Sequence, residues 1–244
     1  MTRRIAMWSG PRNVSTALMR AFEARGDCHV VDEPLYAAYL HATGIEHPGR
    51  DDILAAQPTH PEAALDALAN PTHGKPLQFE KHMAQHWQRD WAFEWLGDVR
   101  HAFLIRDPAA VVASYAKVRE APTPEDLGTL QQAVLLDASS EAGQSPIVID
   151  GDEIRAQPEA MLRKLCARLG IPFASTMLSW SPGRRSSDGV WAPHWYARVE
   201  ASTGFDPPSP GRPCPPEHAH VAAMLRPDYQ RLCALRIRPD PPAA

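Results

Sequence analysis

Groups suited to binding an anion are concentrated in one short segment near the start of the chain. It consists of Gly10, Pro11, Arg12, Asn13, Val14, Ser15 and Thr16, between an apolar run and a helical pattern. A loop that joins a strand to a helix directs backbone N–H groups and the positive end of the helix dipole at one point, which attracts phosphate or sulfate. Arg12 adds a permanent charge and a planar set of donors. The segment predicts an anion site, although a plain strand–turn–helix with a serine cap is an alternative.

This loop departs from the P-loop of ATP- and GTP-hydrolysing proteins, which has the pattern G-x-x-x-x-G-K-[ST]. When the pattern is aligned on Thr16, Val14 and Ser15 stand where the second glycine and the lysine belong. That lysine contacts the β- and γ-phosphates. The sequence therefore argues against ordinary nucleotide hydrolysis.

Three side chains are candidates for a general base. Glu33 follows the second predicted strand, so we expect it at the same sheet edge as the anion-binding loop. His82 and His86 follow the third predicted strand, and a histidine titrates near neutral pH. We favour Glu33 and keep the two histidines as alternatives, while a helix-capping or ion-pairing role for Glu33 also stays open.

The sequence offers little for a metal ion. His82 and His86 are four residues apart and would share one face of a helix, but no third ligand accompanies them. The cysteines are too far apart for a CxxC pair; they are Cys28, Cys166, Cys214 and Cys233. We expect no metal site and free thiols.

Apolar runs and helical patterns alternate along the chain and would position these side chains. We expect strands at residues 5–8, 29–31, 76–80, 101–105 and 146–149. We expect helices at 16–25, 35–40, 61–68, 87–96, 109–118, 125–142, 158–169 and 216–235, with 44–60 irregular. This alternation predicts a parallel sheet with helices on both faces.

We expect a single domain over residues 1–244, with a nucleotide-binding core at 1–172 and a substrate or lid region at 173–244. Six prolines within residues 206–216 exclude regular helix or central strand and predict a surface loop.

Composition narrows the choice of partners and location. The net charge of the 244-residue chain is −4, which gives no general attraction to nucleic acid or anionic membranes. The apolar run at residues 5–8 is too short for a signal peptide, and no run approaches the roughly 18 residues of a membrane span. We expect a cytoplasmic protein that binds neither nucleic acid nor membranes.

Several segments resemble the PAPS-dependent sulfotransferases, where PAPS is 3′-phosphoadenosine 5′-phosphosulfate. Residues 11–16 resemble the family's phosphosulfate loop, P-[KR]-S-G-T-T. The family also has an arginine at the end of a later strand and a serine eight residues on, as Arg106 and Ser114 are here. Residues 147–172 are similar to its following strand, proline turn and helix end. The resemblance spans residues 5–172 and implies a three-layer, P-loop-like α/β fold.

The resemblance implies transfer of a sulfuryl group from PAPS to a hydroxyl or amine of a small-molecule acceptor, without a metal. Arg12 would stabilise the leaving phosphate, and Arg106 with Ser114 would hold the 3′-phosphate. In the tyrosylprotein branch the base is a glutamate after the second strand, which Glu33 matches. The cytosolic branch has a histidine base near the position of His82.

Further assignments follow from the family pattern. Arg184 and Arg185 match a basic loop that covers the 3′-phosphate, and Lys81 could contact the phosphosulfate. Trp191, Trp195 and Tyr196 would line an acceptor pocket or belong to the core.

Val14 replaces a loop glycine of the family, and valine rarely adopts positive φ, so we expect the loop conformation to differ there. Two rival functions stay open: a P-loop-like phosphotransferase or nucleotide hydrolase, and a non-catalytic binding protein. The oligomeric state is also open, with a homodimer as one option.

Overall fold

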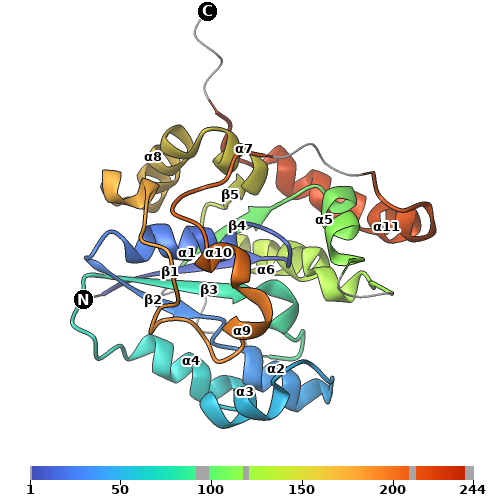
Figure 1. The fold of residues 1–244 in the computed structure, drawn as a ribbon, viewed down its shortest axis with the longest axis horizontal. Helices are drawn as coiled ribbons and strands as arrows, with labels where there is room; N and C mark the ends of the chain where they lie inside the picture. The colour runs from blue at the N-terminus through green and yellow to red at the C-terminus, as the bar shows by residue number, and fades with distance from the viewer. Residues whose placement is uncertain (1, 92–98, 118–120, 209–212, 240–244) are drawn as a thin grey trace, which may run out of the picture.

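A five-stranded parallel sheet crosses the centre of the molecule, with helices on both faces (Figure 1). The computed structural model describes residues 2–91, 99–117, 121–208 and 213–239. The strands are β1 (Arg3–Ser9), β2 (Cys28–Asp32), β3 (Leu77–Met83), β4 (Arg100–Ile105) and β5 (Ile147–Asp150). The predicted parallel α/β architecture is confirmed, and each expected strand is present within a few residues of its predicted bounds.

The strand order β2-β3-β1-β4-β5 places β1 in the middle. The next two strands lie on one side of β1, and the last two lie on the other. In open α/β sheets, ligands bind beyond the carboxyl ends of the strands at such a change of direction. The loop that follows β1 therefore occupies the position that favours a ligand site.

α-Helices connect and follow these strands in the described ranges. They are α1 (Ser15–Glu23), α2 (Tyr36–Thr43), α3 (Arg50–Ala56), α4 (Pro61–Ala69), α5 (Pro108–Tyr115), α6 (Thr129–Glu141), α7 (Gly151–Ala156), α8 (Pro158–Leu169), α9 (Ala192–Trp195), α10 (Ala197–Glu200) and α11 (Ala219–Ala234). Short 3₁₀ turns occur at Ala84–His86 (η1), Glu125–Leu127 (η3), Ser175–Leu178 (η4) and Pro216–His218 (η5).

Central strand β1 is buried on both faces, because its side chains alternate between two cores. Ile5 and Met7 pack with residues of α1 and α8 on one face. Ala6 and Trp8 pack with residues of α6 on the other. This explains why the strand is a continuous apolar run in the sequence rather than an alternating one.

Two sequence predictions about helices were wrong, and a third is described only in part. Residues 44–60 are not wholly irregular, because they contain α3. The expected helix at 125–142 is interrupted at Gly128, whose φ of 73° is left-handed and separates η3 from α6. The expected helix at 87–96 is absent at residues 87–91, which form a turn at 89–90, and its residues 92–96 lie outside the described ranges.

The C-terminal third returns across the carboxyl ends of the strands. Helices α9 and α10 lie over this edge of the sheet (Figure 1). Arg20 of α1 and Asp188 form a buried ion pair at 2.6 Å that attaches the segment before α9 to the core. Helix α11 packs against α5 and α6. Within the described ranges, no helix has both the length and the apolar character needed to cross a membrane.

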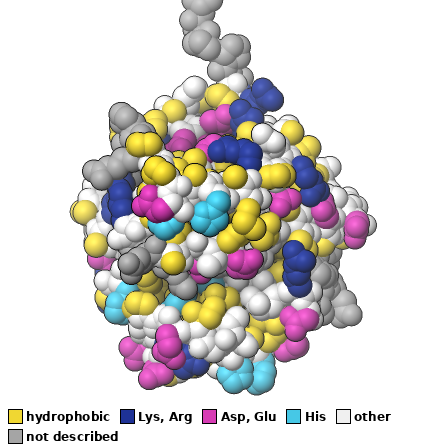
Figure 2. Space-filling view, turned by 90° about the vertical axis from the view of Figure 1, so that its right-hand side faces the viewer, with side chains coloured by type: hydrophobic (Ala, Val, Ile, Leu, Met, Phe, Trp, Pro, Cys, Tyr) yellow, Lys and Arg dark blue, Asp and Glu magenta, His cyan; other side chains and the backbone are white. Residues whose placement is uncertain are grey.

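Acidic and basic side chains are interspersed on the face shown in Figure 2. Four arginines line the cavity described in the next subsection: Arg12, Arg106, Arg155 and Arg198.

Candidate active site

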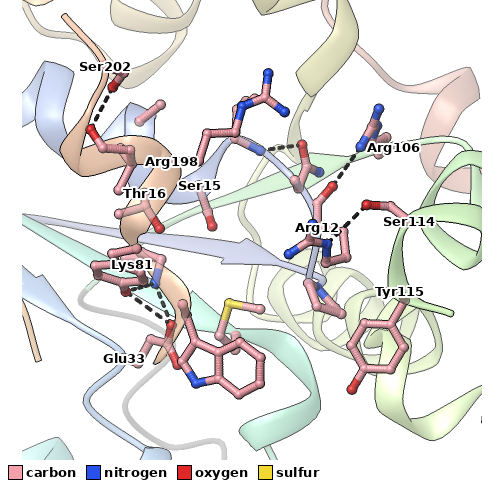
Figure 3. A pocket seen from close by; sticks show the side chains of 18 of the residues that line it. Arg12, Ser15, Thr16, Glu33, Lys81, Arg106, Ser114, Tyr115, Arg198 and Ser202 are labelled. Atoms are coloured by element: carbon pink, nitrogen blue, oxygen red, sulfur yellow. Dashed lines mark hydrogen bonds and ion pairs between the residues drawn. The ribbon is translucent and has the colours of Figure 1, made fainter. Parts of the chain in front are cut away.

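A cavity of about 670 Å³ lies at the carboxyl ends of the strands, beside the loop that follows β1 (Figure 3). Its size is in the range of small-ligand pockets. One end is lined by Arg12, Arg106, Ser114 and Arg198, and the other by Glu33 and His86. The cavity therefore has a cationic end and an end with potential acid–base groups.

Asn13 fixes the shape of the loop at residues 10–16. Its side-chain Nδ2 donates to the Leu104 carbonyl at 3.2 Å, and its Oδ1 accepts from the Val14 N–H at 2.8 Å. The positive φ in the loop falls on Arg12, at 58°, whereas Val14 has a φ of −90°. Val14 therefore has a backbone conformation that valine adopts without strain.

Gly10 packs against the backbone of Leu127 and does not line the cavity. A Cβ atom at this position would overlap the backbone carbonyl of Leu127. Gly10 is thus a packing requirement rather than a ligand contact.

The first turn of α1 has backbone donors to spare. The helix begins at Ser15, and Val14 precedes it without giving a side-chain cap. The N–H groups of Ser15, Thr16 and Ala17 reach no acceptor among the described residues, and all three residues line the cavity. The serine-cap alternative is therefore wrong, and the helix N-terminus is available to an anion.

Arg106 and Ser114, eight residues apart in the sequence, meet the loop at the cationic end. Arg106 donates from Nη1 to the Arg12 carbonyl at 2.8 Å and from Nε to Asp152 at 3.2 Å. Ser114 Oγ accepts from Arg12 Nε at 3.0 Å. Asp107 caps α5 through the Ala109 N–H and pairs with Arg226 at 2.6 Å, so the carboxylate that pairs with Arg106 is Asp152.

Two arginines that the sequence analysis missed, Arg155 and Arg198, also line this end. Arg155 donates to the carbonyls of Asp206 and Pro207, and Arg198 pairs with the Asp206 carboxylate. Desolvation and the charges of Arg106 and Arg198 lower the pKa of Arg12. Mutual repulsion of these cations would be relieved by an anionic ligand.

Arg184 and Arg185 were predicted at this end, but they do not line the cavity. Arg184 is exposed, and Arg185 donates to the Ser181 carbonyl and lies 3.7 Å from Glu23. Their segment lies along α1, away from the loop, so Arg198 takes the place expected for them.

Glu33 and Lys81 lie at the opposite end (Figure 3), in a buried cluster that also contains Asp32 and Tyr196. Lys81 Nζ donates to Asp32 Oδ1 at 2.9 Å, to Glu33 Oε1 at 2.5 Å and to the Tyr196 hydroxyl at 2.7 Å. All three N–H bonds of the ammonium are used, so Lys81 has none left for another ligand. Glu33 Oε2 accepts no hydrogen bond within the described parts of the chain.

The backbone of Glu33 is strained. Its φ is +41°, a value uncommon for a residue with a side chain, and Pro34 follows directly. The Glu33 N–H donates to the Lys81 carbonyl at 2.8 Å, which holds this conformation. Strained backbone is retained most often where it serves a site.

Burial raises the pKa of Glu33, helped by the Asp32 carboxylate and opposed by Lys81. Burial disfavours the charge on Lys81, but Asp32 and Glu33 outweigh it and hold the pKa of Lys81 well above its usual value. The cluster therefore contains a permanent cation and a carboxylate that is more basic than an exposed glutamate.

His86 lines the same end, whereas His82 does not. The His86 ring stacks on Tyr36 and Tyr39, and His86 Nδ1 lies 3.9 Å from Glu33 Oε2. Burial, His47 and Lys81 all lower the pKa of His86 well below its usual value, so the ring is neutral and a weak base.

The prediction of His82 as a candidate base is wrong in its geometry. Alternation along β3 points Lys81 into the cavity and His82 to the opposite sheet face. There His82 stacks on Trp8 with ring centroids 4.2 Å apart and contacts Glu80 at 3.3 Å. Burial lowers the pKa of His82.

The aromatic residues of the C-terminal segment divide between cavity and core. Trp195 and Tyr196 line the cavity. Trp191 is 2% exposed and packs in an apolar cluster around α2, so the core alternative is correct for it and the pocket alternative is wrong. Its indole N–H donates to the Tyr196 hydroxyl at 3.2 Å, which gives it an indirect link to the site.

The sequence analysis also missed Asp32 and Tyr36. Asp32 adjoins Glu33 at the end of β2, which was a usable signal, but its contacts depend on residue 196.

In the described ranges, no group of three or more His, Cys, Asp or Glu side chains is arranged to hold a metal ion.

Comparison with known proteins identifies the family. A family model described as "Sulfotransferase domain" matches residues 3–233. Two curated Arabidopsis thaliana proteins, "Branched-chain-amino-acid aminotransferase-like protein 1" and "protein 2", are 39% and 37% identical over 204 residues, which is 84% of this chain. The chain spans only 37% and 36% of their lengths.

Two solved structures are similar to most of the chain. One is the sulfotransferase domain from the Synechococcus PCC 7002 olefin synthase, with 13% identity, a TM-score of 0.48, and coverage of 93% of this chain and 96% of that one. The other is the sulfotransferase domain from the curacin biosynthetic pathway, with 15% identity, a TM-score of 0.44, and coverage of 93% and 98%.

Proposed function

Because this chain belongs to the sulfotransferase domain family, we propose that it transfers a sulfuryl group from PAPS to a hydroxyl or amine of a small acceptor. The observation that carries the proposal is the division of one cavity. The uncapped N-terminus of α1 and several arginines form one end, and the free Oε2 of Glu33 lies at the other. Sulfuryl transfer requires both an anion site and a base.

The cationic end suits the two anionic groups of PAPS. Residues 12–17 offer the N–H groups of α1 and the Arg12 guanidinium to the phosphosulfate. Arg106 and Ser114 would hold the 3′-phosphate, and Arg198 would add a further contact. The donor supplies an activated sulfuryl group, and these residues bind it and stabilise the charge left on its phosphate.

Glu33 is the proposed base. Its Oε2 would take the proton of the acceptor hydroxyl or amine as the acceptor atom bonds to sulfur and the bond from sulfur to the phosphate oxygen breaks. Burial raises the pKa of Glu33, which makes it a better base than an exposed carboxylate. His86, with its strongly lowered pKa, is better suited to contact the acceptor than to hold its proton.

The acceptor end suggests a neutral or cationic acceptor. Tyr36, Met83 and Trp195 give it apolar and aromatic walls, and Glu33 and Glu46 are its carboxylates. The ammonium of Lys81, the cation there, is fully engaged. A carboxylate or phosphate on the acceptor would therefore meet repulsion without compensation.

Calorimetric binding of PAP, the desulfated donor product, tests the donor site. We expect micromolar binding to the wild type and severe loss in Arg106→Ala. Arg100→Ala is the matched control, because Arg100 is an exposed arginine at the opposite end of the same strand.

A wild type that binds ATP or another anion but not PAP would refute the proposal. Equal PAP binding by Arg106→Ala and Arg100→Ala would refute the donor site while leaving the family assignment intact.

A further inference from the structure

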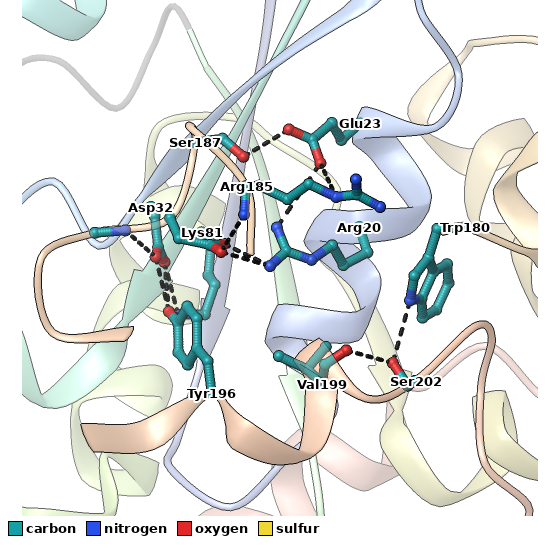
Figure 4. A network of polar contacts seen from close by, with 12 residues as sticks. Arg20, Glu23, Asp32, Lys81, Trp180, Arg185, Ser187, Tyr196, Val199 and Ser202 are labelled. Carbon is teal, nitrogen blue, oxygen red and sulfur yellow. Dashed lines mark hydrogen bonds and ion pairs between the residues drawn. The ribbon is translucent and has the colours of Figure 1, made fainter. Parts of the chain in front are cut away.

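The carboxylate of Asp32 joins three segments of the chain behind the proposed base (Figure 4). Its Oδ1 accepts from Lys81 Nζ at 2.9 Å. Both of its oxygens lie 2.8 Å from the Tyr196 hydroxyl, and its Oδ2 accepts from the Gly189 N–H at 3.0 Å. Asp32 thus connects the ends of β2 and β3 with the segment that leads into α9.

These contacts determine which groups reach Glu33. The Tyr196 hydroxyl accepts hydrogen bonds from Lys81 and Trp191, so its one proton faces the two carboxylates, Asp32 at 2.8 Å and Glu33 Oε1 at 3.4 Å. Lys81 is then held between Asp32 and Glu33 Oε1. As a result, Oε1 is occupied and Oε2 is the oxygen left for another partner.

We propose that Asp32 is a positioning residue for Glu33: it holds Lys81 and Tyr196 so that Glu33 presents Oε2 to the acceptor. Asp32 itself touches neither donor nor acceptor, since its carboxylate is enclosed by the three contacts above and does not line the cavity. This inference rests on the proposed role of Glu33 as base.

Asp32 also limits how strongly the Lys81 charge stabilises the ionised form of Glu33. With Asp32 ionised, the ammonium is shared between two carboxylates. If the charge of Asp32 were removed, Lys81 would pair with Glu33 only, and a repulsive neighbour would be lost. Both changes favour the ionised form of Glu33 and make it a weaker base.

Titratable groups from five elements or segments surround Glu33. Lys81 comes from β3, Asp32 from β2, Tyr36 from α2, His86 from η1 and Tyr196 from the C-terminal segment. Tyr196 acts in the sense opposite to Asp32, because a hydroxyl near Oε1 stabilises the ionised form. The two residues therefore predict shifts of opposite sign.

The test compares Asp32→Asn with wild type, using Asp27→Asn as the matched control. Asp27 lies just before β2 and pairs with Arg25 at the opposite end of the strand from the site. We expect Asp32→Asn to lose roughly 10- to 100-fold in kcat, as for a misplaced catalytic group, with PAP affinity unchanged. The acid limb of its pH–rate profile should move to lower pH, whereas Tyr196→Phe should move it to higher pH.

A second readout does not depend on turnover. Carbon-13 NMR titration of the Glu33 carboxyl, assigned with Glu33→Gln, should give a lower pKa in Asp32→Asn and a higher one in Tyr196→Phe. An unchanged Glu33 pKa in both folded variants would overturn the positioning role of Asp32, even if sulfuryl transfer is established. Failure of wild type to bind PAP would instead refute the proposed function, and the titration would still report on Asp32.

Discussion

Strand β3 contributes to two buried clusters of charged side chains on opposite faces of the sheet. Only one of these clusters faces the cavity. Lys81 pairs with Asp32 and Glu33 at the cavity. Glu80 pairs with Arg4 at 2.7 Å and contacts His82 on the opposite sheet face. The two clusters are equally buried, so burial and ion pairing do not by themselves identify a site.

The clusters differ in how many hydrogen bonds their carboxylate oxygens accept. Both Glu80 oxygens accept hydrogen bonds from Arg4, and Gln78 and His82 add contacts. Glu33 has one oxygen occupied and one open to the cavity. A carboxylate that is fully satisfied stabilises the fold, and one that is half satisfied can take part in chemistry.

The strongest test of this contrast is Glu33→Gln. We expect kcat to fall by roughly 10²–10⁴-fold, as when a general base is removed, with PAP affinity retained. The protein should stay folded, because Lys81 keeps the Asp32 carboxylate as its counter-charge. Rates of sulfuryl transfer with labelled PAPS measure this, and Glu62→Gln on the exposed face of α4 is the control. A fully active Glu33→Gln would remove the distinction between the clusters.

Glu80→Gln should affect stability instead. Removing one partner leaves the Arg4 charge buried, which costs about 3–5 kcal/mol of unfolding free energy in comparable pairs. Urea denaturation measures the loss, and kcat per folded molecule should be unchanged. A drop in kcat without loss of stability would contradict a purely structural role for Glu80.

The two clusters should also titrate on opposite sides of the usual glutamate pKa. Burial raises the pKa of Glu33, so kcat/KM should fall as the pH decreases through a value above that of a free glutamate. The pKa of Glu80 is lowered, because His82 and Arg4 outweigh burial. Its stabilisation is therefore present above the usual glutamate pKa and is lost as the pH falls below it.

Rate and stability profiles against pH would show these two transitions. A single shared transition would contradict the separation of the clusters.

The smallest expected effect concerns the cationic end. Arg198→Ala should weaken PAP binding roughly 2- to 10-fold, the range of one hydrogen bond, because its side chain is largely exposed. Arg184→Ala should leave the affinity unchanged, since Arg184 does not line the cavity. Calorimetry on both variants compares them directly. The reverse ranking would restore the sequence-based assignment of Arg184.

Local patterns were sufficient for the sheet and for the parts of the site that follow strands. The anion-binding loop, Glu33 and Arg106 each come directly after an apolar run, and parallel strands bring such positions to one edge. The exclusion of His82 needed the register of β3, because a shift of one residue exchanges the two faces. The sequence did not decide whether Lys81 or His82 faces the site.

The contributions of the C-terminal third could not be predicted in this way. Arg198 and Tyr196 reach the cavity because residues 179–206 cross back over the sheet, attached by the Arg20–Asp188 pair and the contacts of Asp32. These contacts join residues more than 150 positions apart. No local periodicity encodes such pairs, and Arg198 would be an ordinary surface residue without them.

The sequence by itself determined the α/β class, the strand–loop–helix at residues 5–25 and the candidate base after the second strand, because these depend on short-range hydrophobic patterns and turn chemistry. Only the tertiary structure decided that Lys81 is fully engaged, that Glu33 keeps one oxygen free and that Arg198 rather than Arg184 joins the cationic end. The physical reason is that burial and hydrogen-bond saturation depend on which distant segments meet.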